Sequence, residues 1–326
     1  MMKTLSIIPF TGHCRLWLLA INLLTLLLLT SCSSSDSSVP FIPKNNLEDK
    51  VFVLGAQVDD FGTLVLYVNG TDPNGDPLTV TSLQAASLSV GGTAYTDVDD
   101  ELTITEVVDG DNFLSLAFVT DYSNSTKGEL DFVANILAGM LDNLPLVYEA
   151  QVMTFSDTFE VKQNWSTDLV ALKTAVTIPH TVRNKTALYD SMGVALKGEV
   201  GTTGLIERCR PAHMLVLFTD GDDNMSSEYT SDADVASVAN NDQAVVIVLG
   251  TSKAKDEVLA TLAGDHGAAV QVTDPFSLVA EVESWSASLG NMVKLTLTTV
   301  DTNSKALSIT VGTQTVDVIP KSRCNP

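Results

Sequence analysis

Residues 113–125 read Phe-Leu-Ser-Leu-Ala-Phe-Val-Thr-Asp-Tyr-Ser-Asn-Ser. The part through Val119 is a nearly continuous apolar run with the length of one buried strand. A polar segment follows at once, in which Asp121, Ser123 and Ser125 occupy alternate positions. Apolar residues then recur at helical spacing from Leu130 onward. A buried strand, a polar turn and a helix in this order predict the first unit of a parallel α/β sheet.

The same alternation continues down the chain as far as residue 290. Further apolar, strand-like runs are interleaved with helical patterns, and strands of this kind are covered by helices on both faces of a sheet. The strand-like runs lie at 147–155, 214–218, 244–249 and 268–272, and the helical patterns at 186–197, 232–240, 253–262 and 275–289. We therefore predict a doubly wound, mostly parallel α/β domain over residues 112–290.

The sequence on either side of this domain has the period-two alternation of half-buried antiparallel strands. These runs lie at 63–68, 78–81, 87–90 and 102–107 before the domain, and at 293–300, 306–311 and 315–319 after it. A domain that starts with a strand and ends with a helix has both of its ends at the edge opposite the strand C-terminal ends. We expect one all-β sandwich built from residues 50–111 and 291–326, with the α/β domain inserted. The alternative is two unrelated β appendages.

Several oxygen-bearing side chains follow the predicted strands. Asp220 follows the run that ends at Phe218, Thr186 stands at a predicted helix start, and Asp121 ends the first strand. Ligands of open α/β sheets bind beyond the strand C-terminal ends. We expect these side chains on the solvent side of that edge, outside the core. The alternative reading is that they only cap helices and satisfy turns.

In order and position, these residues resemble the von Willebrand factor type A domain with its metal-ion-dependent adhesion site. The resemblance covers residues 112–290, and Tyr122, Asn124 and Thr126 depart mildly from the residues common in the family. It implies one divalent cation, Mg²⁺ or else Mn²⁺ or Ca²⁺, for which hydroxyl and carboxylate oxygens are suitable ligands. It implies a metal set made of Asp121, Ser123, Ser125, Thr186 and Asp220.

Such a set supplies at most five ligand oxygens, and Mg²⁺ prefers six. A carboxylate of a partner can complete the shell, so we predict a protein or polymer ligand that offers an acidic group. The alternatives are a scaffold in an envelope complex whose metal only stabilises the loop and, with less support, a metal-dependent hydrolase. The sequence has no His-Glu-x-x-His, no Gly-x-Ser-x-Gly and no phosphate-binding glycine loop, so we expect no enzyme. His213 leads into a buried strand, which favours a structural role.

The first 31 residues have the pattern of an export signal. Lys3 and Arg15 precede an apolar run from Leu16 to Leu29 that is too short for a membrane span. Residues 29–32, Leu-Thr-Ser-Cys, resemble a bacterial lipobox, which implies cleavage before Cys32 and acylation of that cysteine. Ser33 after it implies the outer membrane. Residues 32–49 are rich in serine and proline near their start and predict a flexible tether between lipid and fold.

The charge of the chain narrows the class of partner further, and its cysteines indicate a possible disulfide. Removal of residues 1–31 takes away two of the 18 basic and none of the 40 acidic residues, so the net charge of −22 becomes −24. Such a surface repels nucleic acid, and we expect no nucleic-acid partner.

Of the 4 cysteines, only Cys209 and Cys324 lie in the folded part. Cysteines in an oxidising compartment can pair, and we predict a disulfide between these two.

Overall fold

The computed structural model describes the chain from residue 51 to residue 322, with gaps. The described ranges are 51–59, 61–70, 78–84, 88–90, 92–95, 101–108, 111–143, 148–271, 291–298, 307–311 and 314–322. The predicted signal peptide, the tether, Cys32, Cys324 and the predicted helix at 275–289 lie outside these ranges. No helix within them is both long enough and apolar enough to cross a membrane.

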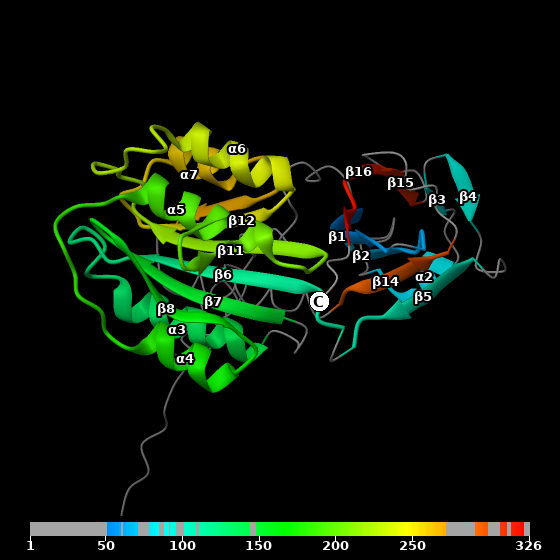
Figure 1. Cartoon of the computed structure of the whole chain (residues 1–326), viewed down its shortest axis with the longest axis horizontal. Coiled ribbons are helices and arrows are strands. Elements are labelled where there is room, and N and C mark those ends of the chain that lie inside the picture. Colours follow the sequence, from blue (N-terminus) through cyan, green and yellow to red (C-terminus); the bar gives the residue numbers. More distant parts are fainter. Residues whose placement is uncertain are drawn as a thin grey trace, which may run out of the picture. The chain divides into compact units, whose positions relative to one another are not determined.

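A six-stranded sheet forms the centre of the α/β region (Figure 1), with strand order β13-β12-β11-β6-β7-β8. All neighbours are parallel except β8, which runs antiparallel to β7. The predicted doubly wound, mostly parallel fold is therefore confirmed. The strands are β6 (Leu114–Asp121), β7 (Tyr148–Phe155), β8 (Phe159–Ser166), β11 (Ala212–Thr219), β12 (Val245–Gly250) and β13 (Ala268–Gln271).

Helices cover both faces of this sheet (Figure 1). On one face lie α3 (Leu130–Asn143) and α4 (Leu169–Thr177). The opposite face is covered by α5 (Leu188–Lys197), α6 (Asp232–Asp242) and α7 (Asp256–Ala263). The connection between α5 and β11 contains the short strands β9 (Gly198–Glu199) and β10 (Thr202–Thr203) and the 3-10 helix η2 (Leu205–Glu207).

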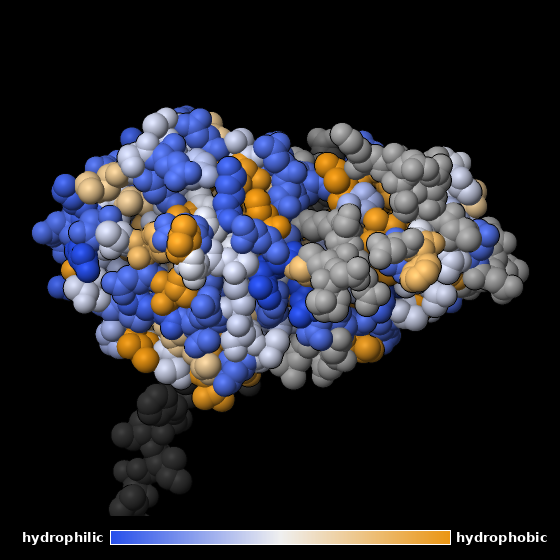
Figure 2. Space-filling view, in the orientation of Figure 1, coloured by the Kyte–Doolittle hydropathy of each residue, from blue (hydrophilic) through white to orange (hydrophobic). Residues whose placement is uncertain are grey.

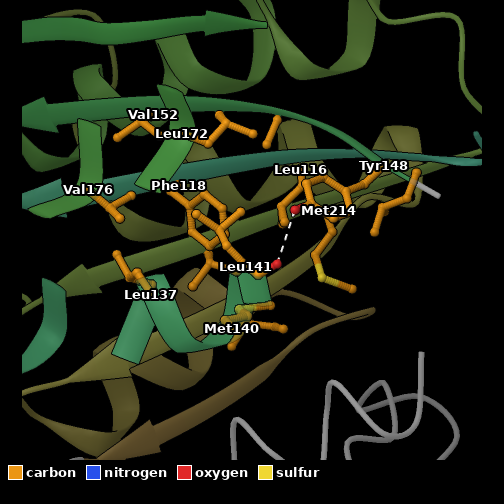
Figure 3. Close-up of a cluster of buried hydrophobic side chains, with 14 of the residues drawn as sticks. Leu116, Phe118, Leu137, Met140, Leu141, Tyr148, Val152, Leu172, Val176 and Met214 are labelled. Carbon is orange, nitrogen blue, oxygen red and sulfur yellow. Dashed lines mark hydrogen bonds between the residues drawn. The ribbon is translucent and has the colours of Figure 1, made fainter. Parts of the chain in front are cut away.

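Side chains of β6 alternate between two apolar cores because successive residues of a strand point to opposite faces. Leu116 and Phe118 pack with α3 and α4, whereas Ala117 and Val119 pack with α5, α6 and α7. Figure 3 shows the first of these cores, where the Tyr148 hydroxyl donates a hydrogen bond of 3.2 Å to the Leu141 carbonyl. Burial on both faces explains why the central strands are apolar runs rather than alternating ones.

Strand β8 and helix α4 are absent from the sequence prediction. All residues of β8 are at least partly exposed, and the strand lies at the sheet edge. Its sequence, Phe-Glu-Val-Lys-Gln-Asn-Trp-Ser, therefore has no buried run to mark it. The strand is stabilised instead by its antiparallel pairing with β7, which cannot be predicted from the local pattern of hydrophobic residues.

Two further sheets contain the strands predicted on both sides of the α/β region. The five-stranded sheet has the order β17-β1-β2-β14-β5 and the four-stranded sheet β16-β15-β3-β4. The first comprises β1 (Val51–Val58), β2 (Leu64–Gly70), β5 (Leu102–Glu106), β14 (Val293–Leu297) and β17 (Lys321–Ser322). The second comprises β3 (Leu88–Val90), β4 (Thr93–Tyr95), β15 (Leu307–Val311) and β16 (Gln314–Val318).

Strand pairing joins the two sequence halves directly. Strand β14 lies between β2 and β5, and β15 pairs with β3. Leu66, Leu295 and Ile309, which come from both halves and both sheets, share one buried apolar cluster. The two β segments are therefore not separate appendages, since neither contains a complete sheet by itself.

The predicted strand at 78–81 is wrong, because the chain forms the helix α2 (Val80–Gln84) there. The Ser82 hydroxyl accepts from the Thr79 amide at 2.8 Å, and the Thr79 hydroxyl accepts from the Ser82 amide at 3.1 Å. These reciprocal bonds satisfy amides at the start of the helix. They outweigh the β propensity of the Thr-Val-Thr sequence, which is a weak preference.

A buried polar network lies at the edge where β6, β7 and β11 begin. Glu149 accepts hydrogen bonds from Arg208 at 2.7 and 2.8 Å and from the Ser115 hydroxyl at 2.8 Å. In the same region His213 Nδ1 lies 2.6 Å from an Asp242 oxygen. His213 is 1% exposed, and its contacts are of the structural kind expected from the sequence.

Candidate metal centre

The end of β6 and the loop after it form the base of the site. Asp121 is the last residue of β6, and its Oδ1 accepts from the Ser123 amide at 2.8 Å. The hydroxyls of Ser123 and Ser125 lie 3.0 Å apart. The Asp-x-Ser-x-Ser segment thus brings one carboxylate and two hydroxyls to one place.

The neighbouring strand contributes the second carboxylate. Strand β11 is parallel to β6, with Phe218 opposite Thr120, so Asp220 directly follows a strand that ends beside Asp121. The Thr219 hydroxyl donates a 3.0 Å hydrogen bond to Asp121 Oδ2. Gly221 has a φ of +80°, a left-handed conformation that glycine adopts without the strain a side chain would bring. The Thr-Asp-Gly segment therefore turns sharply away from the site after presenting Asp220.

Thr186 lies on the loop before α5, and this loop runs beside the Asp-x-Ser-x-Ser loop. The Arg183 amide donates to the Tyr122 carbonyl at 3.1 Å, and Ser123 pairs with Arg183 in a parallel bridge. The structure thus joins Asp121, Ser123 and Ser125 by hydrogen bonds and sets the loop carrying Thr186 next to them. Asp121, Asp220 and the loop that carries Thr186 all lie at the carboxyl edge of the sheet.

The start of α5 is held by the loop that follows Asp220. Its N-cap residue, Ala187, has no capping side chain, so amides of the first turn need acceptors from elsewhere. Polar side chains of the loop after Asp220 supply them, and the Asp190 carboxylate in return accepts from backbone amides of that loop. The amides of Thr186, Leu188 and Asp190 donate to Asn224, Asp223 and Ser226 at 3.1, 2.8 and 3.0 Å respectively. Thr186 is therefore connected by hydrogen bonds to the loop that follows Asp220.

Most of the predicted ligands are buried, which corrects the expectation that they lie outside the core. Asp121 is 0% exposed, and Ser123, Thr186 and Asp220 are also buried, whereas Ser125 is exposed. The covering loop is held down by Thr126, whose hydroxyl donates to the carbonyls of Asp121 and Ser123. The carboxylate of Asp121 at the end of β6 therefore lies beneath a loop and not on the open surface.

Residues beyond the predicted set support the site. Thr126 and Thr219 bond the backbone and the carboxylate of Asp121, and Asn224 bonds Thr186. Thr219 could have been suspected from the Thr-Asp-Gly segment, but nothing local distinguishes Asn224. Asn124, which replaces a common glycine, does not have a positive φ, so the loop needs no glycine there.

Burial makes the charge of the site unfavourable without a cation. Removal from water is the main reason why the pKa of Asp121 rises from 3.8 to about 7, and the nearby charge of Asp220 contributes to this rise. Hydrogen bonds from Ser123 and Thr219 lower the pKa but do not offset burial. A divalent cation at this point would neutralise both carboxylates. The donor set therefore fits a hard cation such as Mg²⁺.

No described group of three or more His, Cys, Asp or Glu side chains is arranged to hold a metal ion. A site that depends on Ser and Thr hydroxyls falls outside that pattern. Hydroxyl ligands leave the bound cation with more net positive charge than additional carboxylates would, which favours an anionic ligand in the open position.

The family model for the von Willebrand factor type A domain matches residues 115–284, which is more than half of the chain. The chain belongs to the von Willebrand factor type A domain family. The match begins in β6 and includes all five predicted ligands. No curated protein matches the chain.

Solved structures of similar fold include proximal thread matrix protein 1 from the mussel byssus, with 19% identity and a TM-score of 0.45 over 59% of this chain. The chain covers 49% of that protein, about half its length. BatB from Bacteroides thetaiotaomicron has 14% identity and a TM-score of 0.40, over 54% of this chain and 98% of BatB. The type V pili tip protein Mfa5 from Porphyromonas gingivalis has 10% identity and a TM-score of 0.41, over 54% of this chain and 94% of the Mfa5 domain.

Proposed function

We propose that this chain binds a protein or polymer ligand through a divalent cation held by Asp121, Ser123, Ser125, Thr186 and Asp220. The observation that carries the proposal is the buried carboxylate of Asp121, which lies beside the Asp220 charge and is hydrogen-bonded to Ser123. Two like charges at a buried strand end are costly without a counter-ion. Membership in the von Willebrand factor type A family supports the same reading.

The cation would bind the partner directly. Three hydroxyls and two carboxylates leave one of six Mg²⁺ positions for an incoming oxygen, and a carboxylate is the oxygen that best offsets the remaining charge. The exposed side chain of Ser125 marks the side from which a ligand would approach. Mg²⁺ fits the donor set, and Mn²⁺ or Ca²⁺ could replace it.

The same geometry bears on the two rival functions. In a scaffold, the metal would only stabilise the loop after β6, and the partner would bind elsewhere. In a hydrolase, a general base would have to lie close to the metal-bound water. Apart from Asp220, the side chains bonded to Asp121 and Ser123 are hydroxyls engaged in hydrogen bonds, which supports a binding module over an enzyme.

Capture of partners from the native envelope tests the proposal. The chain should retain a partner in Mg²⁺ and release it in EDTA, and re-addition of Mg²⁺ should restore capture. A partner held equally well in EDTA would support the scaffold instead. Turnover of that partner by the Mg²⁺-loaded protein would support the hydrolase.

We also propose that the chain is a lipoprotein of the bacterial cell envelope, anchored in the outer membrane through Cys32. The support is the sequence of residues 1–33 alone. Mass spectrometry of the mature protein should show an N-terminal cysteine that carries acyl chains. Detection of an unmodified chain beginning at Met1 would contradict this prediction.

A disulfide between Cys209 and Cys324 remains a prediction, because Cys324 lies outside the described residues. Cys209 lies three residues before the start of β11, at the end of the strand opposite the proposed metal site. Such a bond would close a loop of about 115 residues, for which chain entropy gives up to ~4–5 kcal/mol of stabilisation. Non-reducing peptide mapping should recover the linked pair. Free thiols at both positions in protein from an oxidising compartment would contradict it.

A further inference from the structure

Unpaired positive charge gathers around the candidate metal centre of this acidic chain. Among the lysines with described side chains, several have no carboxylate partner, and all but Lys197 lie on loops at the carboxyl edge of the sheet. These unpaired lysines are Lys127, Lys185, Lys197, Lys253 and Lys255. The loops, which we call the rim loops, are residues 122–129, 178–187 and 251–255.

Two rim loops contain basic residues and no acidic residue. Residues 178–187 include Arg183 and Lys185, and residues 251–255 include Lys253 and Lys255. In a chain with 40 acidic and 18 basic residues, such loops are contrary to the overall balance. Long-range repulsion by the rest of the surface would hinder an acidic partner, so local positive charge is needed where it docks.

The two loops reach the metal set from opposite sides. Arg183 pairs with Ser123 through the backbone, on the β7 side of β6. The Lys253 ammonium donates to the Ser125 carbonyl at 3.3 Å, from the loop after β12 on the other side. Lys253 therefore places a positive charge next to a proposed metal ligand.

Acidic residues near the site lie on the loop 220–231, at Glu129 in the first rim loop, and at Asp157 after β7, which pairs with Arg183 at 3.1 Å. Asp220 belongs to the metal set, and Asp223 accepts from the Leu188 amide at 2.8 Å. Asp222 and Glu228 remain exposed. The excess of unpaired cations thus lies on the rim loops flanking Ser123 and Ser125, whereas the fourth loop is acidic.

An exposed apolar group accompanies these charges. Met225 is 38% exposed, and its sulfur lies 3.2 Å from the Lys185 ammonium. A thioether beside a lysine suits a partner that presents an aliphatic side chain next to a carboxylate. Polypeptides combine these groups, whereas a polyuronate has no aliphatic side chains. Figure 2 shows that the surface over the ends of β6 and β11, at the left of the view, is otherwise mostly hydrophilic.

We propose that the partner is an acidic polypeptide segment, with one carboxylate on the metal and neighbouring carboxylates on Lys185 and Lys253. This inference rests on the proposed function, which supplies the metal contact. The lysines are flexible point charges, so they select for charge density near the coordinated carboxylate rather than for one rigid geometry. Contacts of this exposed kind weaken as salt rises.

Binding of two fluorescent peptides to the mature protein in Mg²⁺ tests the proposal. One peptide repeats Glu-Glu-Leu, and the other has all but one glutamate replaced by glutamine. The wild type should bind the first peptide more tightly, and the double variant Lys185→Ala, Lys253→Ala should weaken its binding by about two- to thirtyfold, the range for two exposed ion pairs. The same variant should change the affinity for the single-glutamate peptide much less. It should also reduce the salt dependence of binding to the first peptide.

Lys197→Ala is the matched control, because it removes an unpaired lysine outside the rim loops. Equal losses in Lys197→Ala and in the double variant, or equal affinity of the wild type for both peptides, would overturn the proposal. Tighter, lysine-dependent binding of oligogalacturonate would overturn the assignment to a polypeptide. If Mg²⁺ stabilises the wild type but neither peptide binds, the proposed role of the rim loops is contradicted, and the proposed metal centre still stands. If Mg²⁺ does not stabilise the wild type, the proposed function is contradicted, and so is this inference.

Discussion

Asp121→Asn should abolish most of the stabilisation that Mg²⁺ gives the wild-type protein. At a Mg²⁺ concentration about 100 times its Kd, binding to the folded state contributes ~2.7 kcal/mol, which corresponds to a rise in Tm of roughly 5–10 °C for a domain of this size. The variant removes the charge of a proposed ligand that is fully buried. We expect its Mg²⁺-induced Tm shift to be below about a quarter of the wild-type value.

Asparagine is the informative replacement because Asp121 is fully buried. Its two oxygens accept from the Ser123 amide and the Thr219 hydroxyl. Asp121→Ala would leave both donors without an acceptor, at a cost of about 1–3 kcal/mol for each. The loss of metal binding would then be mixed with a damaged loop. Asparagine keeps one oxygen that can accept from the Ser123 amide, and its NH2 group can donate to the Thr219 hydroxyl, so the charge is lost with less damage to the loop.

Differential scanning fluorimetry with and without Mg²⁺ measures this effect. Asp317→Asn is the matched control, since it removes an exposed carboxylate on β16 and should leave the Mg²⁺ shift unchanged. Thr186→Ala should reduce the shift less than Asp121→Asn, because it removes a neutral oxygen. Identical shifts in the wild type and Asp121→Asn would place the ion elsewhere and refute the site.

Glu149→Ala should lower the free energy of unfolding by about 3 kcal/mol, near the lower end for breaking a buried ion pair. The Glu149 side chain is 8% exposed and binds Arg208 through both oxygens. Its loss would also leave the buried Ser115 hydroxyl without its acceptor. Because the Arg208 side chain is 28% exposed, water can partly replace the lost carboxylate, which keeps the cost moderate.

A double-mutant cycle with Arg208→Ala isolates the pair. If the contact accounts for the loss, the double variant should be clearly more stable than the sum of the two single losses implies. The Mg²⁺-induced Tm shift should persist in every member of the cycle, because Glu149 lies near the start of β7 and Asp121 at the end of β6. Additive losses measured in urea would show that Glu149 stabilises the fold by other means.

The contribution of Glu149 should also depend on pH. Burial raises the pKa of this carboxyl, but the hydrogen bonds from Arg208 and Ser115 and the charges of Arg208 and Arg210 lower it more, so the pKa is below 4.5. A group with a depressed pKa stabilises the folded state above the pKa of the unfolded chain. This stabilisation is lost as pH falls through the lower, folded pKa. The difference between wild type and Glu149→Ala in urea unfolding should therefore be full at neutral pH and shrink below pH 4.5.

Most elements of the α/β region and the candidate ligand set could be predicted from the sequence, whereas β8 and α4 could not. Buried strands such as residues 113–119 are apolar on both faces, and this pattern is readable without tertiary contacts. Asp121 and Asp220 could be placed at one edge because the carboxyl ends of parallel strands coincide. The balance between strand propensity and helix capping was harder to predict. In α2, two hydrogen bonds between Thr79 and Ser82 outweigh the strand propensity of the sequence.

The burial of Asp121, the capping of α5 and the position of Lys253 depend on tertiary contacts and could not be predicted from the sequence. The bond from Thr219 to Asp121 spans 98 residues, and that from Lys253 to Ser125 spans 128. The α5 amides find acceptors 35 to 38 residues further along the chain. Each contact joins polar residues with no periodic signal of their own. Their partners are set by where the packed strands bring the loops together, which no local pattern encodes.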